Sequence, residues 1–544
     1  MSALNPVQIE IIRNALVSSA EEMSVTIWRT SRSSVVREIL DYSTCVFDAH
    51  GQSVAQAARM PVHLNSMAAC LEDLIAHHIP IEDWHEGDVV ITNDPYSGGQ
   101  HLPDIQTFKP IFVEGRRIAI AGILVHHLDV GGGAPGSYYA DATEIYQEGL
   151  RIPPLKIVEG GRRNDAIVKM LLSNSREPEN VGGDFAAQLA ALETGARSLE
   201  KIGRRYGADR LAEACQRIQA GSEAETRAVF AEIPNGVYEF EDFVDDDGIE
   251  CDRQLRIHAV LTVRDDSVEI DLSGSSDQAK GPINCTLNMT RSAVICGALM
   301  SIGREVPANA GCYRPISVVA PSGSVVNASH PAPVANRMAV GHRVVNAVMG
   351  AFAQAAPERV PASYYGVSYA YALNAFNADG TRQLYFDLEC GGWGGHPEGD
   401  GANGFSCGFH NISNTPVEMI ENDYPVTFLQ YGLIPNSGGA GKFRGGLGLV
   451  REFRLDAPEG TFAANLDRFK VAPYGLFGGQ PGRPGRLAVR RAGGDENLPS
   501  KVAELALKAG DVVRIETSGG GGHGDVQQRD EAAIAFDTEQ GYTA

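Results

Sequence analysis

Two histidines and an aspartate lie at short spacing in the first quarter of the chain. His101 and Asp104 are three residues apart in a segment rich in glycine and proline, and His126 follows further along. Imidazole nitrogens and carboxylate oxygens suit zinc, manganese or iron, and three such ligands leave positions open for water or substrate. The residue types therefore indicate a divalent metal site that could support hydrolytic chemistry.

The segments that carry these residues are expected to form a β-hairpin. Two strand-like runs of mostly apolar and β-branched residues are separated by a turn centred near Gly115. Pairing across this turn places Asp104 opposite Val125 or His126, and directly opposed Cβ atoms lie about 5 Å apart. One hairpin can therefore gather the three candidate ligands around a single point.

The whole chain is predicted to be a multidomain α+β protein with mixed and antiparallel sheets. Residues 1–235 are expected to form an N-terminal α/β metal-binding region, with a helical segment at 165–230. Residues 236–360 are expected to be a β-rich middle region that ends in a helix, because apolar residues recur there with period two. Residues 361–544 are predicted to be a glycine-rich β region. A length of 544 residues allows several such domains.

Glycine is unusually frequent, at 61 residues, and much of it is clustered. The larger clusters in the C-terminal region lie at 391–395, 438–446 and 519–522. Glycine permits positive φ and a close approach between backbones. The interpretation favoured by the sequence is that most clusters form tight turns between strands.

Composition excludes several classes of partner. The net charge of −22, from 46 basic and 68 acidic residues, predicts repulsion from nucleic acid and from anionic membranes. No run of 18 apolar residues predicts a membrane-spanning helix, and the N-terminal segment lacks the pattern of a signal peptide. The nine cysteines form no C-x-x-C pair, which argues against zinc-finger and thioredoxin sites. A cytoplasmic chain with reduced thiols is the expectation.

Many ordered segments of this chain resemble the hydantoinase B family. The resemblance covers almost the whole sequence, and its main segments are Asn93–Tyr96, His101–Asp104, His126–Gly132, Gln147–Pro154, Asn414–Glu418, Ser437–Gly441, Arg444–Gly446 and Ser518–Asp525. Members of that family are the metal-binding subunits of ATP-dependent hydantoinases, 5-oxoprolinases and caprolactamase, and of acetone and acetophenone carboxylases. The resemblance is specific for the family and does not select a substrate.

The resemblance also implies a set of metal ligands. It assigns His101, Asp104 and His126 to the metal, and it adds a carboxylate from the Asp-aromatic-Ser segment, which here is Asp41-Tyr42-Ser43. Zinc is the first choice because the lactam-opening members resemble zinc proteins, while manganese or iron also suits these ligands. The carboxylase members of the family resemble manganese proteins.

Three further residues are candidates for catalytic roles, each with a structural alternative. His63 is a candidate acid–base group or a hydrogen-bonded core histidine. Asp94, before a proline, is a candidate for orienting His101 or a simple turn former. His127 should point to the opposite face of the sheet from His126, where it could pair with Asp129.

The resemblance implies a division of labour with a partner subunit. A hydantoinase A-like subunit would use ATP to phosphorylate the amide oxygen of a hydantoin, 5-oxoproline or lactam, and this chain would hydrolyse the activated intermediate in a heterotetramer or larger complex. The sequence itself has no G-x-x-x-x-G-K-[ST] motif. The alternatives left open are a subunit of a ketone carboxylase of the acetophenone or acetone type, and a non-catalytic scaffold stabilised by metal.

One loop departs from the family pattern. After Gly391-Gly392 the family usually continues with a small residue and arginine, whereas this chain has Trp393-Gly394-Gly395-His396-Pro397. If this loop contacts the substrate, the substrate cannot be inferred from relatives.

Overall fold

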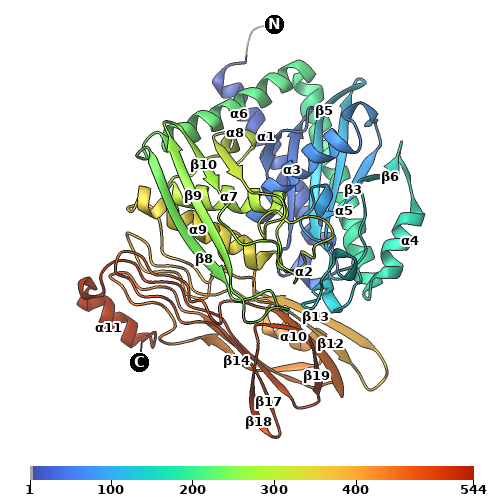
Figure 1. The fold of residues 1–544 in the computed structure, drawn as a ribbon. Coiled ribbons are helices and arrows are strands. Elements are labelled where there is room, and N and C mark those ends of the chain that lie inside the picture. Colours follow the sequence, from blue (N-terminus) through green and yellow to red (C-terminus); the bar gives the residue numbers. More distant parts are fainter. Residues whose placement is uncertain (1–3, 544) are drawn as a thin grey trace.

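The computed structural model describes residues 4–543 and shows a helix-covered N-terminal sheet, a middle sheet with two buried helices, and a C-terminal β region (Figure 1). The N-terminal sheet has seven strands in the order β2-β1-β5-β4-β3-β6-β7. Its strands are β1 (Tyr42–Asp48), β2 (Ser53–Gln56), β3 (Val89–Thr92), β4 (Asp104–Val113), β5 (Arg116–His126), β6 (Leu155–Glu159) and β7 (Arg162–Arg163). The helices of this part are α1 (Pro6–Thr30), α2 (Ser34–Arg37), α3 (Pro61–His77), α4 (Asp165–Asn174), α5 (Pro178–Tyr206) and α6 (Ala208–Phe230).

The two faces of this sheet bury different helices, because successive strand residues point to opposite faces. Ile105 and Val125 lie in the core that α1, α5 and α6 share with one face. Phe108 and Leu124 lie in the core on the α3 face. By the same alternation, Asp104 and His126 are on the α3 face, which is where the candidate site lies.

The middle part contains a four-stranded sheet and two buried helices. Its order is β11-β10-β9-β8, with β10 and β11 parallel and the other pairs antiparallel. Its elements are β8 (Gly236–Val244), β9 (Leu255–Arg264), β10 (Ser267–Asp271), β11 (Ile316–Val319), α7 (Leu287–Ser301), α8 (Ala310–Tyr313) and α9 (Met338–Ala355). The sequence analysis did not predict α7. Ten of its residues, of varied polarity, are buried, so no polar face marks it as an amphipathic helix.

The C-terminal part contains two antiparallel sheets. One has the order β13-β12-β16-β19 and the other the order β14-β15-β20-β17-β18. The elements are β12 (Ala370–Phe376), β13 (Arg382–Leu388), α10 (Val417–Asp423), β14 (Val426–Leu433), β15 (Leu449–Leu455), β16 (Glu459–Asn465), β17 (Arg486–Arg491), β18 (Gly494–Leu498), β19 (Lys501–Lys508), β20 (Val512–Glu516) and α11 (Glu531–Glu539).

Close packing of backbones explains the C-terminal glycine clusters better than tight turns do. The three clusters run beside one another and exchange backbone hydrogen bonds, for example from Gly439 to Gly520. A Cβ atom on Gly392 would lie 1.9 Å from the oxygen of Gly446, and one on Gly520 would lie 1.9 Å from the oxygen of Trp393. Such distances exclude any side chain. The prediction of tight turns at these clusters was therefore wrong.

The predicted fold class is confirmed: helices combine with several antiparallel and mixed sheets. The domain boundaries near 235 and 360 stay predictions. Among the described residues, no helix is long and apolar enough to cross a membrane.

Candidate metal centre

The β4–β5 hairpin brings the three predicted ligands together. Asp104 pairs directly with His126 in the strand register, which confirms the expected hairpin geometry. His101 lies one turn earlier, where its backbone carbonyl accepts a hydrogen bond from the N–H of Asp104. His101 Nε2 lies 3.0 Å from Asp104 Oδ1, and His126 Nδ1 lies 3.1 Å from the same oxygen. The two imidazole nitrogens are 3.2 Å apart.

This triangle of atoms has the dimensions of a metal-binding site. A cation about 2.0–2.2 Å from each ligand atom holds neighbouring ligands roughly 3.0–3.4 Å apart at octahedral to tetrahedral angles. All three side chains are buried, and two ring nitrogens and one carboxylate oxygen face a single point. The residues therefore fit a divalent cation.

Asp41 lies beside this triangle, as the resemblance implied. It immediately precedes β1, and its backbone carbonyl accepts a hydrogen bond from the N–H of His126. Asp41 Oδ2 is 3.9 Å from His126 Nδ1. The side chain is buried, so a second carboxylate is available at the edge of the site.

His63 contacts Asp41 and does not contact the metal triangle directly. It lies on α3, with Nε2 3.4 Å from Asp41 Oδ1 and Nδ1 3.3 Å from Ser43 Oγ. Burial lowers the pKa of His63, so its imidazole is neutral near pH 7. A neutral imidazole paired with a carboxylate is able to accept a proton, and this role for His63 stays a prediction.

Asp94 and His127 lie outside the triangle. Asp94 Oδ1 accepts a hydrogen bond from the N–H of Tyr96, and Oδ2 lies 3.5 Å from Arg151 Nε, so the carboxylate closes a turn. Its role in orienting His101 stays a prediction. His127 points to the opposite face from His126, as expected, and its Nε2 lies 3.3 Å from Gln188 Oε1 on α5.

The expected pairing of His127 with Asp129 was wrong. Asp129 instead forms an ion pair with Arg176, 3.0 Å away, and accepts hydrogen bonds from the N–H groups of Gly131 and Gly136. These contacts hold the glycine-rich loop after β5 and leave no carboxylate oxygen for His127.

Arg337 completes the charge balance of the site, and the sequence analysis missed it. Its Nη2 lies 2.7 Å from Asp104 Oδ2 and 3.1 Å from Gln100 Oε1. Burial raises the pKa of Asp104, but the charge of Arg337 and the hydrogen bonds from His101 and His126 act against burial and hold this pKa well below its usual range. Burial and the charge of Arg337 lower the pKa of His101 to about 3. The triangle therefore presents an ionised carboxylate and a neutral His101, which is the protonation state that a metal requires.

Aromatic side chains from other parts of the chain enclose the site. The ring of Tyr138 lies 5.5 Å from that of His101, and Phe386 on β13 stacks on His126 at 5.7 Å between ring centroids. Arg337 precedes α9, so all three parts of the fold contribute to the enclosure. These apolar walls limit water and strengthen electrostatic interactions inside.

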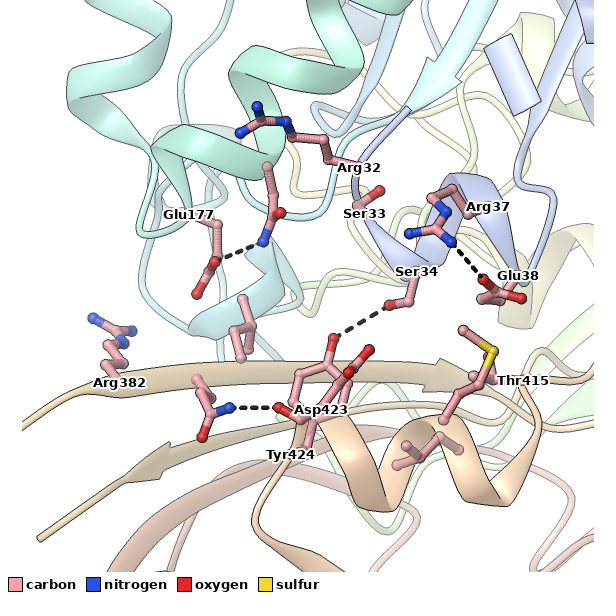
Figure 2. A pocket seen from close by; sticks show the side chains of 15 residues that line it. Arg32, Ser33, Ser34, Arg37, Glu38, Glu177, Arg382, Thr415, Asp423 and Tyr424 are labelled. Carbon is pink, nitrogen blue, oxygen red and sulfur yellow. Dashed lines mark hydrogen bonds and ion pairs between the residues drawn. The ribbon is translucent and has the colours of Figure 1, made fainter. Parts of the chain in front are cut away.

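A separate polar pocket lies between α2 and the C-terminal β region (Figure 2). Its volume is about 230 Å³, and three arginines (Arg32, Arg37 and Arg382) line it together with Glu38, Glu177 and Asp423. Because basic and acidic side chains both line this pocket, it does not favour an anion or a cation. The candidate metal ligands do not line this pocket, so its wall and the metal triangle are distinct features of the described residues.

Comparison with known proteins decides the family. The family model for hydantoinase B/oxoprolinase matches residues 5–526. The chain belongs to the hydantoinase B/oxoprolinase family. This confirms the resemblance that the motifs indicated.

The relatives of this hydantoinase B/oxoprolinase chain include proteins named caprolactamase and 5-oxoprolinase. It is 32% identical to the caprolactamase subunit beta of Pseudomonas jessenii, over 99% of this chain and 94% of the relative. It is 31% identical to 5-oxoprolinase 1 of Arabidopsis thaliana, and this match covers 95% of this chain and 42% of the relative. The crystal structure of the ATP-dependent caprolactamase from Pseudomonas jessenii matches 100% of this chain and 95% of that chain, with 30% identity and a TM-score of 0.94.

Proposed function

We propose that this chain is the metal-dependent subunit of an ATP-dependent enzyme that opens cyclic amides. The single observation that supports this most is the buried triangle of His101, Asp104 and His126 in a chain of this family. Relatives named caprolactamase and 5-oxoprolinase act on cyclic amides, which makes a hydantoin, 5-oxoproline or another lactam the substrate class.

The cation would be held by the triangle, with Asp41 as a further ligand. When bound, a zinc-class ion supplies Lewis-acid polarisation and lowers the pKa of water toward 7. Zinc is our first choice, and manganese or iron would suit the same nitrogen and oxygen donors.

The surrounding side chains have separate tasks in this proposal. Arg337 holds the outer oxygen of Asp104 and places a fixed positive charge where negative charge grows on the reacting oxygen. His63, neutral and 3.4 Å from Asp41, receives the proton that the attacking water releases. Tyr138 and Phe386 exclude bulk water from the reacting atoms.

Activation of the amide belongs to a partner in this proposal. A hydantoinase A-like subunit phosphorylates the amide oxygen with ATP. Water then adds to the activated carbon, the ring C–N bond breaks as the nitrogen leaves as a protonated amine, and a second water hydrolyses the resulting acyl phosphate to a carboxylate and phosphate. The lack of a P-loop motif in the sequence supports this division. The caprolactamase relative is itself named as a beta subunit, which supports a heteromer, and we propose a heterotetramer or larger.

The test is reconstitution of this chain with a hydantoinase A-like subunit. We expect ATP-dependent ring opening of at least one compound among hydantoins, 5-oxoproline and lactams, and no ATP hydrolysis by this chain alone. Aryl ketones with bicarbonate are screened in parallel. Consumption of ketone and bicarbonate with no cyclic amide opened would overturn the proposal in favour of a carboxylase.

A metal-loaded complex that turns over none of these compounds would favour the scaffold alternative. A lactam-dependent ATPase activity of the isolated chain would contradict the division of labour. Both outcomes leave the metal site itself open to separate measurement by metal analysis.

A further inference from the structure

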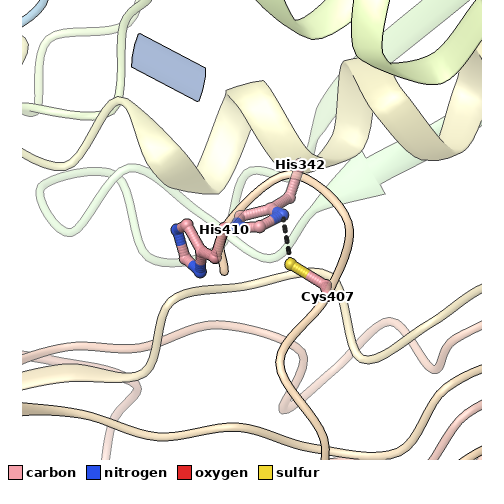
Figure 3. Close-up of side chains that lie close together, drawn as sticks. All are labelled: His342, Cys407 and His410. Atoms are coloured by element: carbon pink, nitrogen blue, oxygen red, sulfur yellow. Dashed lines mark hydrogen bonds between the residues drawn. The ribbon is translucent and has the colours of Figure 1, made fainter. Parts of the chain in front are cut away.

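A second cluster of metal-binding side chains lies between the middle and C-terminal parts of the fold (Figure 3). His342 lies on α9, while Cys407 and His410 are three residues apart in a loop that precedes α10. The N–H of His410 donates to the carbonyl of Cys407, so a turn brings these two side chains to one side. None of these residues belongs to the first site.

The distances in this cluster are close to those of a zinc-type site. Cys407 Sγ is 3.9 Å from His342 Nδ1, and one ligand atom from each of the three residues lies within 4.8 Å of the others. Zinc–sulfur and zinc–nitrogen bonds of about 2.3 Å and 2.0 Å at a tetrahedral angle place sulfur and nitrogen about 3.5 Å apart. Small side-chain movements would therefore bring all three ligands to a common cation.

The buried imidazoles of this cluster also have unused nitrogens. His342 Nε2 and His410 Nδ1 are buried and have no hydrogen-bond partner in the described part of the chain. The other nitrogen of each ring is held by a hydroxyl group: Tyr364 at 2.9 Å from His342 Nδ1, and Ser368 at 3.1 Å from His410 Nε2. Buried polar atoms in folded proteins nearly always have a partner, so an unfilled nitrogen in each ring points to a missing ligand. In His342 the nitrogen nearest Cys407 is Nδ1, so a cation bound there would displace the hydroxyl of Tyr364.

A cavity gives this cluster a route to solvent. The cavity has a volume of about 560 Å³, and its wall includes Cys407, His410, Asn411 and Trp393. Trp393 is the first residue of the loop that departs from the usual family pattern. A cation held by three protein ligands would therefore have its fourth position available to water or to an oxygen donor that enters the cavity.

We propose that His342, Cys407 and His410 form a second cation site, selective for zinc-class divalent ions. One thiolate and two imidazoles are softer ligands than the carboxylate and imidazoles of the first site, and they favour Zn²⁺ or Co²⁺ over Mg²⁺ and Mn²⁺. The open position takes a small oxygen ligand such as a carboxylate. This inference does not depend on the proposed function of the first site.

Cobalt substitution tests the second site without an activity assay. The purified full-length chain is freed of metal, titrated with Co²⁺, and followed by absorption in the near ultraviolet, where thiolate-to-cobalt charge transfer is seen. The first site contains no sulfur, so this band does not report on the first site, and the cysteine variants assign it. We expect the band in the wild-type chain at one equivalent of the sulfur-ligated ion, and loss of the band in Cys407→Ser.

Two variants serve as controls. Cys312→Ser removes another buried thiol, on α8, and should keep the band; Asp104→Asn alters the first site and should also keep it. His410→Gln should weaken cobalt binding by about tenfold or more. Far-ultraviolet circular dichroism verifies that each variant is folded.

Two results would overturn the second site. One is a wild-type chain without the charge-transfer band, and the other is a band of full intensity in folded Cys407→Ser. If Cys407→Ser does not fold, the band in wild type and its displacement by one equivalent of Zn²⁺ decide the question, because absence of either contradicts the proposal.

Discussion

The two histidine clusters of this molecule are built in different ways. In the first, Asp104 and His126 face each other across consecutive strands, and the three mutual ligand distances are 3.0 to 3.2 Å. In the second, His342 comes from a helix and meets a loop residue, Cys407, at 3.9 Å. Strand register holds directly opposed Cβ atoms about 4.5–5.5 Å apart, whereas a helix–loop contact depends on packing between distant segments.

The difference extends to the donors. The first cluster offers nitrogen and oxygen ligands and carries the charge of Arg337 at its edge. The second replaces the carboxylate by a thiol, so it prefers softer ions. A preformed site suits catalysis at a fixed geometry, and a looser one suits a cation whose binding draws its ligands together.

The largest expected effect is at the first cluster. Asp104→Asn keeps the shape of the side chain but removes the charge that faces both imidazoles and Arg337. We expect turnover of the reconstituted complex to fall roughly a thousandfold or more, because Lewis-acid stabilisation is worth several kcal/mol. Turnover and metal content of the same sample provide the measurement. Normal turnover with one cation fewer per chain would break the distinction between the two clusters.

Neighbouring histidines give a matched pair of variants. His126→Gln should remove the cation from the first cluster, whereas His127→Gln should keep it, since His127 faces Gln188 on the other side of the sheet. His127→Gln should lower the free energy of unfolding by about 1 kcal/mol, because it loses the hydrogen bond between His127 and Gln188. Metal analysis and thermal unfolding separate the two outcomes, and equal metal loss in both variants would refute the assignment of faces.

A smaller effect concerns how Arg337 is positioned. Glu148 is buried and accepts hydrogen bonds from the N–H groups of Val334 and Ala335, just before Arg337. Burial raises the pKa of Glu148 to about 8, so the folded state binds this proton more tightly than the unfolded state. Its contribution to stability is complete below the ordinary pKa near 4.5 and is lost as pH rises through about 8.

Glu148→Gln mimics the protonated acid and should remove this dependence. Between pH 6 and pH 9 the wild type should lose roughly 2 kcal/mol relative to the variant. Denaturant unfolding at a series of pH values measures the difference, with Glu193→Gln, at an exposed ion pair, as the control. Parallel pH curves for wild type and Glu148→Gln would show that this carboxyl group does not titrate as described.

What could be predicted from sequence follows the same contrast between local and distant contacts. The register of Asp104 and His126 followed from a short turn and alternating residues, and the family motif added Asp41. Arg337 could not be found, since 233 positions separate it from Asp104 and only tertiary packing joins them. Cys407 and His410 are three residues apart, but their third partner, His342, lies 65 positions from Cys407, and only tertiary packing joins them.

The most direct test of the account is an anomalous-scattering map at the zinc edge from crystals of catalytically active protein. We predict a peak about 2 Å from His101 Nε2, Asp104 Oδ1 and His126 Nδ1, with its height lost in Asp104→Asn. The central claim would be contradicted if protein that opens cyclic amides showed no peak between these three atoms, either at the zinc absorption edge or at those of manganese and iron.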